Sequence, residues 1–219
     1  MIQLFWLRTD LRIADNTALS QALSNGPTVA VYLITPQQWL AHDDAPCKVD
    51  FWLRNLACLR EQLGKLNIPL LIRNCADWQQ APVTLLQLSQ QIGAGAVHCN
   101  EEYGIHETRR DRACSSLLEP QGIAFTAHFD QLLLKPGSVL TQSGNYFQVF
   151  SQFRKVCYQR LHRSLPACLP YPTAQAPLPI NSDELPAGVS GFAQPDVALR
   201  QLWPAGEAAA QQRLQQFAE

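Results

Sequence analysis

Hydrophobic and polar positions along the chain form short apolar runs separated by longer amphipathic stretches. Five runs have the length and composition of buried strands: Ile2–Leu7, Val29–Ile34, Pro69–Ile72, Ala96–Cys99 and Ile123–Ala127. Between them the pattern predicts four helices: Asn16–Leu23, Cys47–Leu63, Ala81–Ile92 and Ile105–Leu118. Asp15 is the expected N-cap of the first helix, and Thr35–Pro46 is expected to be a loop.

This alternation of strand and helix predicts an α/β fold with a doubly wound, five-stranded parallel sheet, Rossmann-like, in the order 3-2-1-4-5. In such a sheet, strands one and four flank the topological switch point, and ligands bind outside their carboxyl ends. The segments that leave these two strands are Arg8–Arg12 and Asn100–Glu107. Both are polar and charged, so they are the expected ligand-binding segments.

The pattern changes after the fifth strand and divides the chain into four expected parts: an α/β domain over 1–130, a helical extension packing on it over 131–163, a Pro-rich linker over 164–196, and a final segment over 197–219. The extension contains a predicted helix over Phe147–Leu161. The linker is expected either to wrap over the domain or to be loose. Ala210, Leu214 and Phe217 form an apolar stripe on the last helix that lacks an evident partner.

Composition narrows the class of protein. Apolar residues make up 47% and charged residues 16% of the 219 residues, which is typical of a folded domain. The net charge of -1 provides no global attraction for nucleic acid. The seven cysteines include no CxxC pair and are expected to be reduced, which favours a cytoplasmic location. No leader and no apolar run of about 20 residues is evident, so no membrane contact is expected.

Three groups of residues are candidates for chemistry. Three charged residues alternate at the strand exit: Arg8, Asp10 and Arg12. They form either a structural ion-pair cluster or a polar surface that contacts a ligand or another domain. His42 lies in the expected loop. His106 and Glu107 open a helix, where Glu107 either favours the helix macrodipole in the first turn and pairs with Arg110 three residues on, or binds the N–H edge of a heteroaromatic ring. Neither GxGxxG nor GxxxxGK[ST] is present, so a nucleotide-dependent dehydrogenase is not expected.

Several motifs resemble the DNA photolyase/cryptochrome family. The opening Trp6-Leu7-Arg8-Thr9-Asp10-Leu11-Arg12, continued by Asp15-Asn16-Thr17-Ala18-Leu19, is similar to the first signature of that family. Thr35-Pro36-Gln37-Gln38-Trp39 and Val97-His98-Cys99-Asn100-Glu101-Glu102-Tyr103 resemble segments of bacterial photolyases. The chain departs from the family at Leu7, where phenylalanine is usual, and at Gly104-Ile105-His106.

The resemblance implies an N-terminal domain that carries a light-harvesting antenna, usually methenyltetrahydrofolate and in some members a deazaflavin. FAD, the electron-transfer tryptophans and the DNA-binding face belong to a C-terminal helical domain, of which residues 197–219 resemble the start. The candidate cofactor-binding residues are His42, His106, Glu107, Asn100, Arg8 and Asp10. Among these, the resemblance implies that Glu107 bonds the pterin ring and that the two histidines line its pocket. Arg8 and Asp10, together with Arg12, are alternatively expected to stabilise the domain or its docking to the helical domain.

The expected function is therefore that of the chromophore-binding N-terminal domain of a deoxyribodipyrimidine photolyase, the light-driven enzyme that repairs cyclobutane pyrimidine dimers in DNA. Its expected partners are the antenna chromophore and the helical FAD domain, with DNA reached only through that domain. The chain alone is expected to repair nothing. Two alternatives remain open: a fragment of a cryptochrome blue-light photoreceptor, and a stand-alone ligand-binding or interaction module with the same fold.

Overall fold

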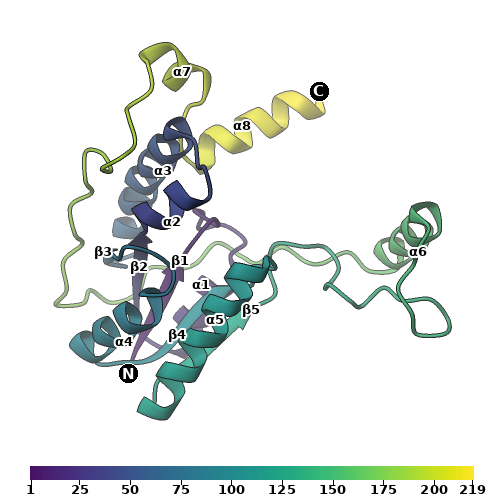
Figure 1. The fold of residues 1–219 in the computed structure, drawn as a ribbon, viewed down its shortest axis with the longest axis horizontal. Coiled ribbons are helices and arrows are strands. Elements are labelled where there is room, and N and C mark those ends of the chain that lie inside the picture. Colours follow the sequence, from purple (N-terminus) through teal and green to yellow (C-terminus); the bar gives the residue numbers. More distant parts are fainter.

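The computed structural model describes residues 1–219 and contains one five-stranded sheet in the order β3-β2-β1-β4-β5 (Figure 1). Every neighbouring pair of strands is parallel. The strands are β1 (Ile2–Leu7), β2 (Thr28–Ile34), β3 (Leu70–Asn74), β4 (Ala94–Asn100) and β5 (Ala124–His128). The predicted doubly wound parallel sheet and its strand order are therefore confirmed.

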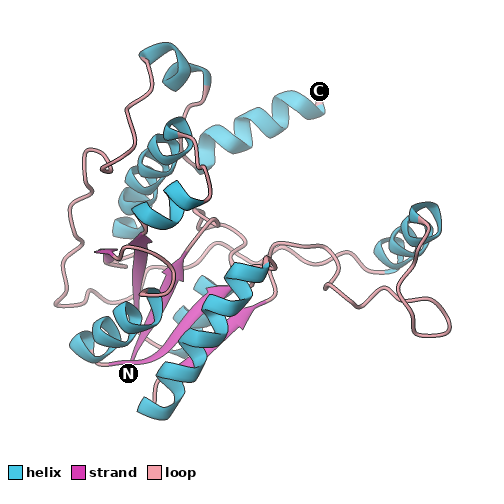
Figure 2. Ribbon diagram, in the orientation of Figure 1, coloured by secondary structure: helices cyan, strands magenta, loops and turns pink.

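Helices cover both faces of this sheet (Figure 2). Those that follow the strands are α1 (Thr17–Asn25), α2 (Pro36–Ala41), α3 (Pro46–Lys65), α4 (Ala81–Ile92) and α5 (Ile105–Leu118), and a 3-10 turn, η1 (Glu119–Gln121), precedes β5. Successive residues of β1 point to opposite faces. Phe5 packs in a core with α1 and α3, whereas Leu4 packs in a second core with α4 and α5. Both faces of the sheet are thus buried, as continuous apolar strands require.

The cap of α1 differs from the prediction. Asn16, not Asp15, is the N-cap, and its side-chain oxygen accepts a hydrogen bond from the Leu19 N–H at 3.1 Å. Asp15 has a left-handed φ of 51°, and its carboxylate accepts from the Leu169 N–H at 2.8 Å. Two adjacent residues with strong capping preference cannot be told apart by sequence, because the backbone turn decides which of them faces the helix.

The segment predicted as a loop over Thr35–Pro46 contains the short helix α2. Pro36 occupies its first turn, where a missing N–H costs nothing and the fixed φ suits a helix. Six residues are too few to display a helical period, so the polar sequence around Gln37 and Gln38 was misleading. The helix matters for function because it ends at His42 and buries Trp39 against the sheet.

Within 131–163, which were expected to form a helical extension packing on the α/β domain, the helix lies away from that domain (Figure 1). This helix, α6 (Phe150–Arg163), has no buried residue. Its aromatic side chains contact one another instead: the ring centroids of Phe147 and Phe153 are 6.2 Å apart, and those of Phe150 and Phe153 are 6.5 Å apart. The apolar spacing was correctly identified as helical, but spacing carries no information about which surface it covers.

The Pro-rich segment 164–196 wraps over the domain along the edge strand β3. The Asp183 N–H donates to the Leu70 carbonyl at 2.9 Å, and the Asp183 carboxylate accepts from the Ile72 N–H at 2.8 Å. Its apolar residues reach both cores; Leu178 and Ile180 pack on one and Phe192 on the other. The segment therefore satisfies the backbone of an otherwise open sheet edge.

The chain ends in α7 (Val197–Leu202) and α8 (Glu207–Ala218). The Glu207 carboxylate accepts hydrogen bonds from the backbone N–H groups of Ile13 and Ala14, at 3.0 and 3.2 Å. The predicted stripe on α8 is exposed, with Leu214 at 67% and Phe217 at 89% of full accessibility. All seven cysteines are free thiols. None of the helices combines the length and the apolar character that crossing a membrane requires.

Candidate functional site

A cavity of about 160 Å³ opens at the carboxyl ends of β1 and β2. Its lining comes from the ends of these strands, from α2 and α3, and from the segments after β3 and β4. Arg8 and Glu107, which belong to the two segments predicted from the topology, line this cavity, and so does His42, whereas His106 does not. The contribution of β2, through Tyr32, Leu33 and Thr35, was not predicted from the topology.

Aromatic side chains form the walls of this cavity. Trp39 of α2 and Trp52 of α3 meet with their ring centroids 5.2 Å apart, and Tyr32 lies buried on β2. Burial raises the pKa of the Tyr32 phenol, and the nearby carboxylates Glu102, Asp10 and Asp44 raise it further. Tyr32 is therefore a neutral phenol at physiological pH. These walls suit a flat, largely apolar ring.

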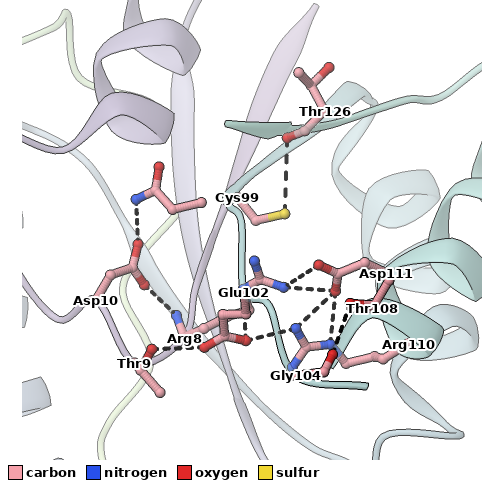
Figure 3. A network of polar contacts seen from close by, with 11 residues as sticks. Arg8, Thr9, Asp10, Cys99, Glu102, Gly104, Thr108, Arg110, Asp111 and Thr126 are labelled. Carbon is pink, nitrogen blue, oxygen red and sulfur yellow. Dashed lines mark hydrogen bonds and ion pairs between the residues drawn. The ribbon is translucent and has the colours of Figure 1, made fainter. Parts of the chain in front are cut away.

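Two arginines and two carboxylates form a buried ionic cluster, here called the polar floor: Arg8, Glu102, Arg110 and Asp111 (Figure 3). Arg8 Nη1 donates to both oxygens of Asp111 at 2.7 and 2.8 Å. Arg110 donates to Glu102 at 2.8 Å and to Asp111 at 2.8 and 3.0 Å. Its guanidinium also lies between two indole rings, 4.7 Å from the Trp6 centroid and 4.8 Å from the Trp78 centroid.

The polar floor is electrically balanced. Burial alone would raise the pKa of Glu102, but Arg8 and Arg110 lower it below its ordinary value. Burial alone would lower the pKa of Arg8, but the carboxylates Glu102 and Asp111 raise it. Two guanidinium groups thus face two carboxylates, and their formal charges sum to zero. The polar floor is therefore a rigid support for the cavity rather than an anion trap.

His42, His106 and Glu107 lie together and are here called the rim. The His42 ring contacts Trp78 edge-on at 5.3 Å between centroids and lies 5.6 Å from the His106 ring. The side-chain amide nitrogen of Gln38 lies 2.8 Å from His42 Nε2. The side-chain oxygen of Gln38 accepts a hydrogen bond from the backbone N–H of Trp78. Since the amide donates, Nε2 accepts, and the proton of neutral His42 is on Nδ1.

The Glu107 carboxylate has no ion-pair partner. Arg110, three residues on, was the expected partner but pairs with the polar floor instead. The carboxylate folds back over the start of α5, where a Cβ built on Gly104 would lie 2.0 Å from Glu107 Oε2. Gly104 therefore provides the space in which this carboxylate sits. The structure removes the ion pair with Arg110, but Glu107 remains the acidic residue in the first turn of α5, where it favours the helix macrodipole.

Asp10 and Asn100 do not line the cavity, although both were predicted to bind the cofactor. With Asn16 they form a buried set of contacts, here called the turn lock. The Asp10 carboxylate accepts from the Arg8 N–H at 2.9 Å and from the Asn100 amide at 2.6 Å. The Asn100 amide also donates to Asn16 at 2.9 Å, and its oxygen accepts from the Ala18 N–H at 2.9 Å. These polar atoms hold the turn from β1 into α1.

Sequence reasoning missed several residues of the site, chiefly Trp39, Trp52, Trp78, Glu102 and Arg110. An available signal was that Trp39 and Trp78 stand beside polar segments that follow strands, where an indole has no strand or helix face to fill. Glu102 lies within the predicted segment Asn100–Glu107 and Arg110 lies three residues beyond it, but no spacing rule joins them across eight residues of turn and helix.

The strand order, the cavity at the carboxyl edge and its aromatic walls define the class: an α/β ligand-binding domain of the doubly wound type. A family model described as DNA photolyase matches residues 3–173, and the chain therefore belongs to the DNA photolyase family. The chain is 43% identical over 155 residues to a deoxyribodipyrimidine photo-lyase of Vibrio cholerae, which covers 70% of this chain and 33% of that relative.

Solved structures agree with this assignment. The chain is similar to a cryptochrome of Synechocystis sp., with a TM-score of 0.80 and 26% identity over 99% of this chain and 46% of that one. It is also similar to an archaeal photolyase of Sulfolobus tokodaii, with a TM-score of 0.64 and 25% identity over 77% and 36% of the two chains. The latter structure holds two FAD molecules and implies a novel light-harvesting cofactor in that protein. The chain thus spans less than half the length of these relatives.

Proposed function

We propose that this chain is the light-harvesting, chromophore-binding domain of a deoxyribodipyrimidine photolyase, and that its cavity binds the pterin ring of methenyltetrahydrofolate. The observation that carries the proposal is the Glu107 carboxylate, which lies at the mouth of an aromatic cavity without an ion-pair partner. Glu107 is only partly buried, so its carboxylate is accessible to a ligand donor from the cavity. The guanidine-like edge of a pterin offers two N–H groups to such a carboxylate.

The rest of the rim supports the same ligand. His42 presents Nδ1–H or its ring face, and His106 flanks it with a second imidazole. Trp78 backs His42 and keeps the ring in place. A flat heterocycle between these groups would be held at its edge by Glu107 and at its faces by aromatic rings, which is the arrangement that gives both affinity and orientation.

The cavity is small for a complete ligand site. Its volume of about 160 Å³ is below the roughly 300 Å³ at which small-molecule pockets usually begin. It accommodates one bicyclic ring but not a whole folate. We therefore propose that a C-terminal helical domain, which also holds FAD and contacts DNA, closes the cavity in the complete protein. When bound, the chromophore supplies light absorption; without the second domain, the chain repairs no DNA.

An absorbance titration of the purified chain with methenyltetrahydrofolate tests the proposal. The expected result is a saturable red shift of the chromophore band that is lost in Glu107→Gln, because the amide presents an N–H where a ring N–H must be accepted. Gly104→Ala is a second variant: its methyl group displaces the Glu107 carboxylate without removing it, so affinity should fall about tenfold. Glu61→Gln, an exposed carboxylate on α3, is the matched control.

A flavin-type ligand is the second candidate, and the two FAD molecules of the Sulfolobus tokodaii photolyase favour it. Buried Trp39 and partly buried Trp52, beside Tyr32, would stack a tricyclic deazaflavin or flavin deeper than the rim. In that case binding would survive Glu107→Gln and fail in Trp52→Ala. The likeness to the Synechocystis cryptochrome keeps a photoreceptor fragment as the alternative parent protein. The free thiols support a cytoplasmic location in either case.

A further inference from the structure

A second cavity, of about 250 Å³, lies between α3 and α7. Its apolar lining includes Phe51, Leu199 and Trp203, and three cations complete it: Lys48, Arg54 and Arg200. No carboxylate lines this cavity. A hollow that combines aromatic surface with cations alone suits an organic anion: a carboxylate or another oxyanion on an apolar body.

The charges around this cavity are not balanced. Asp50, buried behind it, is bonded by both Arg54 Nε, at 2.8 Å, and Arg200 Nη2. Burial alone would raise the pKa of Asp50, but these two arginines hold it below its ordinary value. One carboxylate facing two guanidinium groups leaves one positive charge unmatched. The Nε atom of Arg200 is buried and has no hydrogen-bond partner, and the same holds for Nη2 of Arg8 in the polar floor, so the difference between the two cavities lies in the balance of charge. The polar floor of the first cavity, in contrast, has equal numbers of both charges.

The two cavities share Lys48, which lines both. Lys48 Nζ pairs with Asp44 at 2.5 Å and lies 4.8 Å from the centroid of Trp52, and both of these residues line the first cavity. The neighbouring residues of α3, Cys47 and Phe51, line the second cavity. A ligand that extends from the aromatic walls of the first cavity across Lys48 therefore arrives between Phe51 and the arginines.

We propose that the second cavity is a subsite for the acidic tail of the chromophore, and that Arg200 and Arg54 bind its glutamate carboxylates. The inference rests on the proposed function, because the ring of the same molecule would occupy the first cavity. The aromatic linker between ring and tail would lie across Lys48 and against Phe51. The subsite selects chromophores that carry an anionic tail and anchors the half of the molecule that the small first cavity leaves outside.

Affinity measurements with three matched ligands test this inference: methenyltetrahydropteroate, which lacks glutamate, and methenyltetrahydrofolate with one and with three glutamates. The wild-type chain should bind the triglutamate form about tenfold or more tightly than the pteroate. Arg200→Gln should weaken binding of the glutamate forms by about tenfold and change that of the pteroate less than about twofold. Arg60→Gln is the control. Arg60 lies on α3, like Arg54, and pairs with Glu184 of the Pro-rich segment, so its replacement should change the affinity for neither the pteroate nor the glutamate forms.

The outcomes separate the two claims. Equal affinity of the wild-type chain for all three ligands would overturn the subsite and leave the ring site standing. An equal loss for pteroate and folate in Arg200→Gln would do the same, because it would show a structural role for the arginine. Binding of none of the ligands would overturn the proposed function and the subsite together. The wild-type comparison needs no variant, so it decides the matter even where Arg200→Gln fails to fold.

Discussion

The polar floor and the rim lie side by side at one edge of the sheet, yet they differ in how their polar atoms are used. Each carboxylate of the polar floor is bonded by two arginines, and its members are nearly inaccessible to solvent. At the rim, Glu107 has no ion-pair partner, and the two imidazoles face each other across a gap of 5.6 Å between centroids. A charged residue beside a cavity therefore indicates ligand binding only where ion-pair partners within the protein do not already balance its charge.

The same comparison explains the turn lock. Asp10 and Asn100 have the residue types of ligand-binding groups and lie at the topological switch point. Their polar atoms are already bonded to Arg8, Asn16 and Ala18, so a ligand would have to break contacts that hold the turn from β1 into α1. Two of the six predicted cofactor-binding residues are in this way structural, and Arg8 supports the cavity from its floor.

The largest effect should follow from breaking the polar floor. Arg110→Met leaves Glu102 and Asp111 with one arginine between them and removes a cation from between Trp6 and Trp78. We expect the free energy of unfolding to fall by about 3–5 kcal/mol, the usual cost of removing one partner from a buried ionic cluster. Urea denaturation measures this change. A loss below about 1 kcal/mol would show that the polar floor is not structural.

A smaller loss should follow from opening the turn lock. Asn100→Ala removes the donor to the buried Asp10 carboxylate and the acceptor for the Ala18 N–H. We expect a loss of about 1–3 kcal/mol in unfolding free energy, since buried polar groups are left unsatisfied. Affinity for methenyltetrahydrofolate, measured well below the unfolding transition, should remain unchanged. Abolished binding in a folded Asn100→Ala chain would restore Asn100 to the site.

Acid should destabilise the domain in two steps. The buried His98 and its stacked neighbour His128 both have a pKa below the ordinary 6.5, mainly because burial disfavours the charged ring. The unfolded chain then binds protons more tightly, so stability should fall as the pH drops below about 6.5. Glu102 also has a lowered pKa, so a second loss should begin below about 4.5.

Thermal unfolding followed across this pH range measures both steps. His98→Gln keeps a hydrogen-bonding side chain between Gln3 and His128 but cannot gain a proton there. This variant should show a smaller first step and an unchanged second one. Stability that is constant from pH 7.5 to 5.5 in the wild-type chain would contradict the assignment of neutral, buried histidines.

The sequence predicted the bounds of those helices and strands whose apolar residues recur with a regular spacing. β1, α4 and α5 lie within the predicted bounds, because apolar runs and helical stripes mark them directly. α2 was missed because six residues show no period. The helix within residues 131–163 lies away from the α/β domain rather than on it, and its aromatic side chains contact each other. The wrapped course of the Pro-rich segment depends on single hydrogen bonds such as those of Asp183, which no pattern encodes.

The location of the candidate site and the residues of its rim were predictable from the sequence. The ion pairs among its charged side chains were not. Topology placed Arg8 and Glu107 at one edge of the sheet, and the resemblance to photolyases added both histidines. Which arginine pairs with which carboxylate depends on side-chain directions in three dimensions. Arg110 had Glu107 within reach on the same helix and bonds Glu102 and Asp111 instead, because its guanidinium lies between Trp6 and Trp78.

The central claim is that Glu107, which forms no ion pair, binds the ligand of the first cavity. The most direct test measures two quantities in Glu107→Gln: the free energy of unfolding by urea, and the affinity for methenyltetrahydrofolate by absorbance titration. We predict a change in unfolding free energy within about 0.5 kcal/mol of the wild type, together with loss of the saturable red shift. A destabilised chain, or a stable one that binds the chromophore as well as the wild type does, would contradict the account.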